Sequence, residues 1–469
     1  MEIDKKEITV LESKTAQWLY GNFAASKEVV DFDCRLRARA IADDCRWANI
    51  AELWLNDPAK WRAMRAAGVD ERLCTDPEAP ALERFEAWAA TLTAIIGSPL
   101  YVLSNMELRR LFDIDEPLSA KNAHEIFDRC NEKLATPEFS MRGLLRKQNI
   151  GVVCTENDPS DSLEFHIKMA AEPFETSVLP VWTPDRLLAV GDPVAFNSYV
   201  TRLGAVSGVD IATFDDLIEA LQVRHNFFDQ NGAKITVQHM EQISAAEFRR
   251  SEVGRIFRKI ARGKRPLSAD EAAKFRTAMT LELAQMDWRS GWSRILRFGR
   301  RADVNSRCFA QLGRSTGFDA ITETPVVEPL LRLLDRLDSD DHLCRTMLCA
   351  ADSSLDYRLA TLAGSFQNGR YGGCRIQLGL EGDSFGLAKQ AVDRLTVMSD
   401  TGLLSGFAGF ASQSNSPVGF VAHDLFRRTL CNVVGGGIEA QHLTDDEAAA
   451  VGSMIENICS RNARNFFGI

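Results

Sequence analysis

Short apolar runs alternate with segments of helical periodicity over most of the chain. The first run, Val29–Leu36, ends in polar residues and is followed by a segment with the spacing of a helix. Runs of this kind are typical of strands that are buried on both faces of a parallel sheet. Nine runs are strand candidates: 29–36, 99–103, 150–155, 177–182, 234–237, 283–287, 345–349, 374–380 and 407–411. Apolar strands separated by helices predict an α/β fold.

The number of runs predicts a closed barrel. Eight strand–helix units make a (β/α)8 TIM barrel, so one of the nine candidates must be peripheral or wrong. Two stretches, at about 71–147 and 244–277, are mostly helical in pattern and are expected to be insertions. No repeat of fixed period and no linker rich in glycine or proline divides the chain. We therefore expect one barrel domain over residues 1–469, with long helical insertions.

Composition narrows the class of protein. The 469 residues carry a net charge of -10, and 45% are hydrophobic and 26% charged, as in ordinary globular proteins. The acidic balance argues against a nucleic-acid or membrane-surface partner, and no signal peptide or bilayer-spanning run is visible. Eleven cysteines without a CxxC pair favour reduced thiols. We expect a cytoplasmic homo-oligomer that acts on a small molecule.

Polar residues stand where many of the predicted strands end. Asp33 and Arg35 are two residues apart on the first strand, so both side chains point to one face. Such a pair is a candidate site, although a structural ion pair is the commoner role. Barrel enzymes do their chemistry at strand ends, and the polar residues there are Asp33, Arg35, Asn105, Glu156, His239, Asp287, Arg289, Glu381 and Asp383.

Several short landmarks occur along the chain in a fixed order. They include Glu52-Leu53-Trp54-Leu55, Lys60-Trp61-Arg62-Ala63-Met64-Arg65, Leu179-Pro180 with Trp182, Gly317-Phe318-Asp319 and Phe426-Arg427-Arg428. On these landmarks the sequence resembles the uronate isomerases of the amidohydrolase superfamily over nearly its full length. The resemblance implies a distorted (β/α)8 barrel and a divalent metal, usually zinc. It also implies interconversion of glucuronate with fructuronate and of galacturonate with tagaturonate.

The positions that bind metal in that family are changed here. The family's first strand ends in a His-x-His metal pair, which the resemblance aligns with Asp33 and Arg35. A guanidinium has no lone pair to offer a metal. The family's last strand carries Thr-Asp-x-Arg, and the matching residues are Ser412-Gln413-Ser414-Asn415. We therefore expect no bound metal and no other cofactor.

Other motif positions differ as well. The family's Trp-Arg-Pro-Asp corresponds to Trp182-Thr183-Pro184-Asp185, so Thr183 replaces a substrate-binding arginine. Its Leu-His-Ile-Gly is matched with Trp288-Arg289-Ser290-Gly291, which again puts an arginine in place of a histidine. His239 is retained from a Ser-Asp-His motif. The scaffold landmarks match while the strand ends differ, which indicates a rebuilt polar site.

Three residues are the catalytic candidates: Asp33, His239 and Asp287. His239 is a candidate acid or base, and a core histidine is the alternative. Asp33 can abstract protons if burial raises its pKa, but pairing with Arg35 would lower it. We expect Arg35 and Arg289 to face one pocket and bind an anionic group, with salt bridges as the alternative. The other expected substrate-binding residues are Asn105, Gln238, Thr183, Gln413, Glu381 and Asp383.

These observations lead to three readings of function. The leading one is an enzyme, an isomerase or a lyase, that performs metal-independent acid–base chemistry on a small oxygenated, anionic molecule. The second is the uronate isomerisation itself with an atypical site. The third is a binding protein without catalytic activity.

Overall fold

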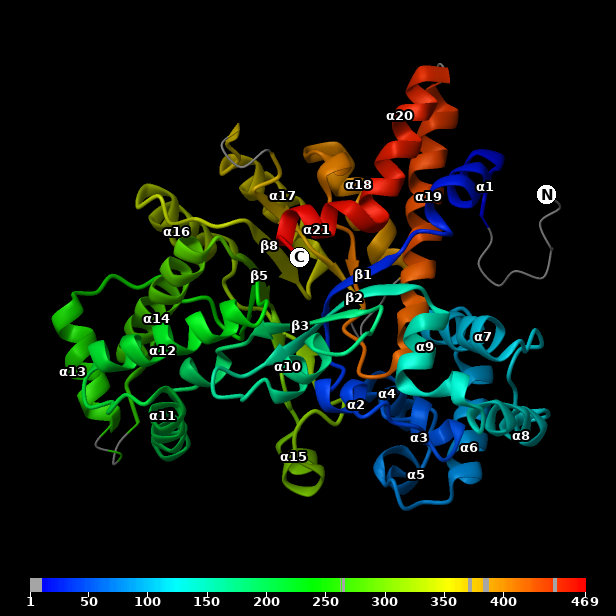
Figure 1. Ribbon diagram of the computed structural model, residues 1–469, viewed down its shortest axis with the longest axis horizontal. Coiled ribbons are helices and arrows are strands. Elements are labelled where there is room, and N and C mark those ends of the chain that lie inside the picture. The colour runs from blue at the N-terminus through cyan, green and yellow to red at the C-terminus, as the bar shows by residue number, and fades with distance from the viewer. Residues whose placement is uncertain (1–10, 262, 264–265, 370–372, 383–387, 442–444) are drawn as a thin grey trace.

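A curled sheet of seven parallel strands forms the centre of the fold in the computed structural model (Figure 1). The structure describes residues 11–469 except 262, 264–265, 370–372, 383–387 and 442–444. The order in the sheet is β1-β2-β3-β4-β5-β8-β9. The strands are β1 Val29–Cys34, β2 Ile150–Asn157, β3 Ser177–Trp182, β4 Ile235–Met240, β5 Ser293–Phe298, β8 Thr346–Ala350 and β9 Ile376–Leu378.

A second, short pair of strands closes the sheet into a barrel. Strand β10, Leu380–Glu381, continues β9 after Gly379 and pairs in parallel with β11, Phe410–Ala411. A glycine separates β9 from β10 because a β-carbon at Gly379 would collide with side chains of β8. Beyond β11, the carbonyl of Ser414 accepts a hydrogen bond from the backbone N–H of Arg35 at 2.9 Å. This seam joins the last strand to the first, and the predicted α/β barrel is confirmed.

Two of the predicted strands are wrong, and one strand of the seven-stranded sheet is unpredicted. Residues 99–103 begin helix α7, Pro99–Phe112, and residues 283–287 lie within helix α14, Ala269–Ser290. The unpredicted strand is β5, which follows α14 directly. A short apolar run fits a buried helix as well as a strand, because both bury such a run completely. The left-handed Gly291 ends α14 and lets β5 begin.

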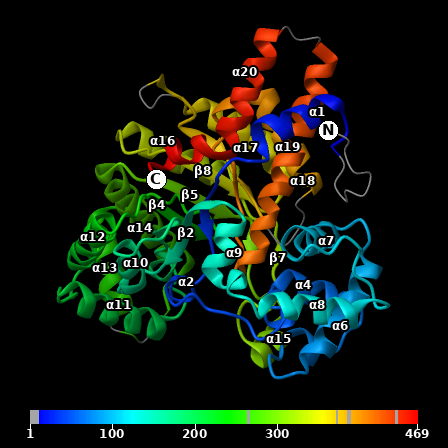
Figure 2. The same cartoon turned by 45° about the vertical axis from the view of Figure 1, so that its right-hand side comes forward.

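Helices surround the barrel in three groups. Between β1 and β2 lie α2 Ala38–Ala42, α3 Ile50–Trp54, α4 Pro58–Ala66, α5 Glu71–Thr75, α6 Ala81–Ala94, α7, α8 Ala123–Leu134 and α9 Met141–Lys147. Helices α3 to α8 gather to one side of the sheet in both ribbon views, around an apolar cluster of their own (Figures 1 and 2). The second group covers β3 to β5 and contains α10 Glu164–Ala170, α11 Pro193–Ser207, α12 Phe214–Gln230, α13 Arg250–Ala261 and α14.

The third group comes from the N-terminal region and from the last third of the chain. It contains α1 Lys14–Leu19, α16 Val327–Ser339, α17 Asp356–Ser365, α18 Ala388–Thr401, α19 Ala422–Gln441, α20 Asp445–Glu456 and α21 Asn462–Phe467. Helix α1 packs against α19, which brings the first and last parts of the described chain together. A short excursion after β5 holds β6 Arg300–Arg301, α15 Ser306–Leu312 and β7 Ala320–Ile321.

Apolar side chains fill the barrel and leave polar groups to one end. Inward-facing residues such as Phe32, Val237 and Ile295 form one continuous cluster. Helix α21 closes the end at which the strands begin, where the rings of Phe467 and Phe32 lie 4.6 Å apart. The opposite end, at which the parallel strands finish, is the barrel mouth, and barrel enzymes place their active sites there.

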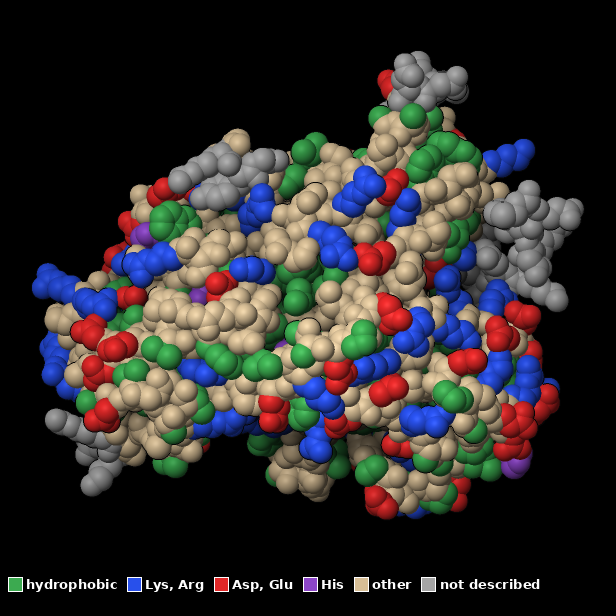
Figure 3. All heavy atoms as spheres, viewed as in Figure 1, with side chains coloured by type: hydrophobic (Ala, Val, Ile, Leu, Met, Phe, Trp, Pro, Cys, Tyr) green, Lys and Arg blue, Asp and Glu red, His purple; other side chains and the backbone are tan. Residues whose placement is uncertain are grey.

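Charged side chains of both signs are interspersed over the face shown in Figure 3. Within the described part of the chain, no helix is long and apolar enough to span a membrane. That the protein has no nucleic-acid partner and assembles as a homo-oligomer stays a prediction.

Candidate active site

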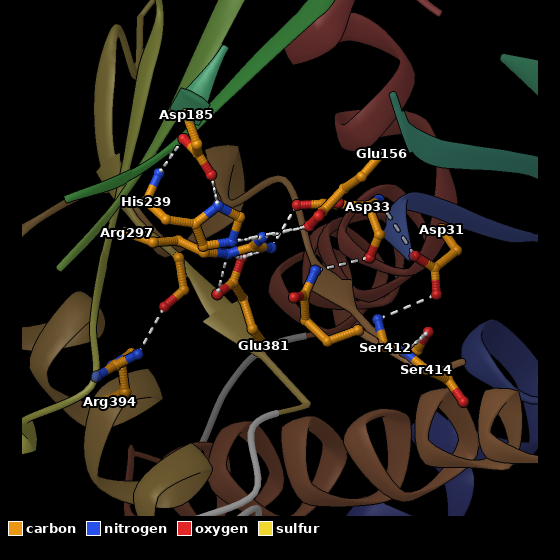
Figure 4. A network of polar contacts seen from close by, with 12 residues as sticks. Asp31, Asp33, Glu156, Asp185, His239, Arg297, Glu381, Arg394, Ser412 and Ser414 are labelled. Carbon is orange, nitrogen blue, oxygen red and sulfur yellow. Dashed lines mark hydrogen bonds and ion pairs between the residues drawn. The ribbon is translucent and has the colours of Figure 1, made fainter. Parts of the chain in front are cut away.

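Arg297 lies at the centre of a polar network at the barrel mouth (Figure 4). Side chains alternate along a strand, so Arg297 faces the barrel interior together with Ile295 of the same strand. The guanidinium is surrounded by three acidic residues from three other strands. They are Asp33 on β1, Glu156 on β2 and Glu381 on β10. The Arg297 side chain is only 10% exposed, so these ion pairs are largely shielded from water.

Every N–H donor of the Arg297 guanidinium has an acceptor. Nε lies 3.0 Å from both carboxylate oxygens of Glu381. Nη2 donates to Glu381 at 2.7 Å and also to Asp33. Nη1 donates to Glu156 at 2.9 Å and to Nε2 of His239 at 3.1 Å. The five donors of the planar group are therefore used within the protein, and the group is held in one orientation.

His239, on β4, is oriented from its other side by Asp185. Oδ2 of Asp185 accepts from Nδ1 of His239 at 2.6 Å, and Oδ1 accepts from the His239 backbone N–H at 3.0 Å. Because a carboxylate only accepts hydrogen bonds, Nδ1 carries the hydrogen and Nε2 presents its lone pair to the mouth. The His239 side chain is 36% exposed. This makes it a fixed acid–base group within reach of solvent.

The network shifts its acids in opposite directions. Burial raises the pKa of Asp33 well above its usual range, and this effect exceeds the lowering by Arg297. Burial also acts to raise the pKa of Glu156, but His239 and Arg297 bring it below its usual range. Arg297 likewise lowers the pKa of Glu381 against the effect of burial. The mouth thus holds two carboxylates beside a guanidinium and one acid that resists ionisation.

Three of the predicted binding residues also lie at the mouth. Arg35 is exposed just beyond β1, its charge contributes to the low pKa of Glu156, and within the described residues no carboxylate forms an ion pair with it. The side-chain amide of Gln413 donates to the carbonyl of Asp33 at 3.1 Å. Thr183 follows β3, and its buried hydroxyl has no hydrogen-bond partner among the residues described.

Asp287 and Gln238 are not at the mouth, which corrects two of the predicted roles. Asp287 is buried on α14, where it accepts hydrogen bonds from Thr236 at 2.7 Å and contacts Nε2 of His225 at 3.1 Å. Gln238 is on β4 but faces outward, and its side chain binds Arg294. Both belong to a closed cluster between the barrel wall and the helices. The prediction for Asp287 is wrong because it assigns 283–287 to a strand and so puts Asp287 at a strand end.

Asn105 and Arg289 also lie elsewhere. Asn105 is buried within α7, where its amide donates to the Tyr101 carbonyl at 2.8 Å and accepts from the Leu118 N–H at 2.9 Å. Arg289 is exposed at the end of α14, just before β5 begins, so it lies at the end of the barrel opposite to Arg35. The prediction of one pocket shared by the two arginines is wrong. Asp383 lies outside the described residues.

Sequence reasoning missed three central members of the network as site residues: Arg297, Asp185 and Glu156. Glu156 is among the polar strand ends without an assigned role, and Asp185 appears only as the last residue of the segment matched to Trp-Arg-Pro-Asp. Arg297 escaped notice because the Leu-His-Ile-Gly motif was matched at 288–291. The segment 296–299, Leu-Arg-Phe-Gly, keeps the leucine and the glycine at the same spacing and ends a true strand.

The acids at the mouth do not form a metal site. The carboxylates of Asp33, Glu156 and Glu381 converge, but they converge on the Arg297 guanidinium, whose charge repels a cation. Among the described residues, no group of three or more His, Cys, Asp or Glu side chains is placed to hold a metal ion. Zinc needs three or four such ligands, so the donor set does not fit the metal that the family resemblance implies.

Comparison with known proteins decides the family. Residues 1–467 match the family model described as glucuronate isomerase. The chain belongs to the glucuronate isomerase family. A uronate isomerase of Bacteroides thetaiotaomicron is 41% identical over 460 residues, which cover 98% of each chain. One from Phocaeicola vulgatus is 40% identical over 460 residues, with the same coverage.

A solved structure shows the same fold. The crystal structure of a uronate isomerase from Thermotoga maritima has a TM-score of 0.91 at 24% identity, covering 99% of this chain and 100% of that one. The predicted resemblance to the uronate isomerases is confirmed. Family membership makes this protein an enzyme of the isomerase class.

Proposed function

We propose that this protein isomerises a uronate or a closely similar anionic sugar acid by proton transfer between side chains and substrate, without a divalent metal. The observation that carries the proposal is the His239–Asp185 pair. It places an oriented, partly exposed imidazole at the mouth of a barrel that belongs to the glucuronate isomerase family. Interconversion of an aldehyde sugar and a ketone sugar moves one proton between neighbouring carbons and one between their oxygens, and a single acid–base group can carry the first.

In this proposal His239 carries the proton. Nε2 takes a proton from the carbon beside the substrate carbonyl and returns it to the former carbonyl carbon, while the proton of the neighbouring hydroxyl group passes to the former carbonyl oxygen. Asp185 keeps the hydrogen on Nδ1 and stabilises the imidazolium that forms between the two steps. Nε2 now accepts a hydrogen bond from Nη1 of Arg297 at 3.1 Å, so the substrate must displace that bond when it binds.

In this proposal Arg35 binds the anionic group of the substrate. Arg297 has no free donor for it, whereas the Arg35 guanidinium is exposed at the same mouth and forms no ion pair within the described part of the chain. A guanidinium binds a carboxylate with two parallel hydrogen bonds, which orients as well as holds it. Gln413, whose side-chain amide donates to the Asp33 carbonyl at the mouth, is the residue that we assign to the hydroxyl groups of a sugar acid.

The carboxyl groups at the barrel mouth are the reason that the proposed reaction uses no metal. The acids that could supply oxygen ligands are bound to the Arg297 guanidinium. In this proposal the substrate oxygen on which negative charge develops lies beside the fixed positive charge of that guanidinium. In a site with little water such a charge stabilises an enediolate without a Lewis acid.

The test measures isomerisation, proton exchange and metal content on the same preparation. Glucuronate and galacturonate are followed by proton NMR in D2O, before and after treatment with a chelator, and the metal content is measured by elemental analysis. We expect isomerisation or exchange of the proton beside the carbonyl that the chelator does not change. His239→Gln should abolish it, and Arg289→Met, at the far end of the barrel, should not. The absence of both turnover and proton exchange, with both sugar acids, would refute the proposed activity.

A metal-dependent uronate isomerase is the second candidate, because relatives 40% to 41% identical carry the name uronate isomerase. Stoichiometric zinc or manganese, with activity lost on chelation and restored by the metal, would favour it.

A further inference from the structure

We propose that the Arg297 guanidinium is a built-in cation that occupies the place of a divalent metal ion in this barrel. The inference concerns charge and cation binding at the mouth, so it holds or fails independently of which substrate is turned over. Three features of the described residues support it: the convergence of acids, the enclosure of the guanidinium and the position of Arg297 on its strand.

The acids converge from distant parts of the chain. Asp33, Glu156 and Glu381 lie on β1, β2 and β10, and only the closure of the barrel brings them together. Each sends a carboxylate to the same guanidinium, at 2.9 Å for Glu156 and 2.7 Å for Glu381, with Asp33 also in contact. Acids gathered at strand ends around a single positive centre resemble the surroundings of a bound cation in their charge pattern.

The guanidinium is enclosed as a bound ion would be. The Arg297 side chain is 10% exposed, its five donors are all used, and Figure 4 shows the acids and His239 around it. Removal of the positive charge would leave three acids facing one another across the space that it fills. Repulsion between them is relieved only by protonation or by another cation.

The position of Arg297 fits the same interpretation. Arg297 stands in Leu-Arg-Phe-Gly, where the family motif has a histidine, and Asp33 stands where the first strand's motif has another. A buried arginine is costly unless its donors and its charge find partners. Glu156 and Glu381 supply the negative charge, and Asp33 supplies a further acceptor for Nη2. The two changes are therefore complementary: one introduces the cation and the other adds an acceptor for its N–H groups.

The experiment removes the guanidinium and asks whether a metal ion replaces it. Arg297→Met keeps the apolar stem and frees the three acids and His239, which together offer oxygen and nitrogen donors. Wild-type protein and variant are treated with a chelator and then titrated with ZnCl2 or MnCl2, each alone. Binding is measured by calorimetry and stability by melting temperature. We expect no binding by the wild type, and metal binding by the variant that raises its melting temperature by at least about 2 °C.

The matched control is Arg294→Met on the same strand. It makes the same chemical change in the closed cluster behind the barrel wall, where Asp287 is the only acid that forms an ion pair with Arg294 among the described residues. This variant should lose stability and gain no metal binding. Metal rescue of both variants would show a nonspecific effect and overturn the inference.

A second variant covers the case in which Arg297→Met does not fold. Arg297→Lys keeps the charge, and we expect it to fold and to ignore both metals. Refolding of Arg297→Met only in the presence of a metal would support the inference. Refolding with neither metal, or a folded variant that binds neither, would overturn it. Stoichiometric zinc or manganese in the wild-type protein, with a melting temperature that falls on chelation, would overturn it as well.

Discussion

Arg294 and Arg297 lie on the same strand, and each is paired with an aspartate and lies near a histidine, yet their surroundings differ. Arg294 faces the helices, is 1% exposed and has its Nε 3.2 Å from Oδ2 of Asp287. Arg297 faces the barrel interior at the mouth, where His239 is 36% exposed. The strand alternation separates the two arginines, and helices α12 and α14 cover only one of them.

The comparison teaches that residue types alone do not make a site. Both clusters contain Arg, Asp and His within contact distance. In the closed cluster, His225 and Asp287 are fully buried, so no substrate reaches them. At the mouth, the strands end and the helical layer does not cover His239. A ligand therefore has access to one cluster, and we assign stability to the closed cluster and chemistry to the open one.

The largest expected effect distinguishes the two histidines. His239→Gln should lower the isomerisation or exchange rate between about 10²- and 10⁴-fold, because the acid–base group is lost. Its free energy of unfolding should fall by only about 0.5–1.5 kcal/mol, because the ring is partly exposed and a hydrogen bond to Asp185 is lost. His225→Gln should keep its rate per folded molecule and lose about 1–3 kcal/mol, because a buried partner of Asp287 is removed. NMR rates and urea denaturation measure both; a rate loss in His225→Gln would break the assignment.

Arg294→Met tests the stability of the closed cluster directly. It leaves Asp287 buried without its counter-charge, so we expect the free energy of unfolding to fall by about 3–5 kcal/mol. Arg289→Met is the control, since this arginine is exposed on a helix end and should change stability by less than about 0.5 kcal/mol. Urea denaturation followed by circular dichroism gives both numbers. Equal effects of the two substitutions would contradict the picture of a sealed cluster.

Acid should destabilise the protein through another buried histidine, His166, which lies outside the barrel. Burial of His166, which bonds the hydroxyl of Thr155 at 2.8 Å, lowers its pKa to about 4. The folded state binds this proton less well than the unfolded chain, whose histidine pKa is about 6.5. The free energy of unfolding is therefore not reduced by His166 above pH ~6.5, and it falls by about 3 kcal/mol as the pH drops to ~4. His166→Gln should flatten this part of a urea-midpoint profile; an unchanged slope would mean that His166 is not the cause.

The smallest effect sharpens the description of the mouth. The pKa of Asp33 is raised in the folded state. The contribution of Asp33 to the free energy of unfolding is therefore complete below its unfolded-state pKa and is lost as the pH rises through its folded-state pKa. Asp33→Asn removes that loss and should be slightly more stable than the wild type at neutral pH, but not in acid. Glu381→Gln should show the opposite sign, because Arg297 lowers the pKa of Glu381. Melting temperatures across the pH range decide between the two; the same sign for both would contradict the protonation pattern.

Local signals were sufficient for much of the fold and for part of the site. The runs at 29–36 and 150–155 are strands, and His239, Glu381, Arg35 and Gln413 do lie near strand ends. The prediction failed at 283–287, where an apolar run belongs to a long helix. That failure displaced the whole segment, so Arg289 was chosen over Arg297. Both errors have one cause: a short apolar run does not distinguish a buried strand from a buried helix.

By itself, the sequence determined that the protein is an α/β barrel with helical insertions, that it resembles the uronate isomerases and that it lacks their first-strand histidines. Only the tertiary structure decided which polar residues act together. Asp33, Glu156 and Glu381 are hundreds of residues apart, and no local pattern relates them to Arg297. Barrel closure brings the four together at one end, and the direction of each side chain on its strand determines whether it faces the mouth or the helices.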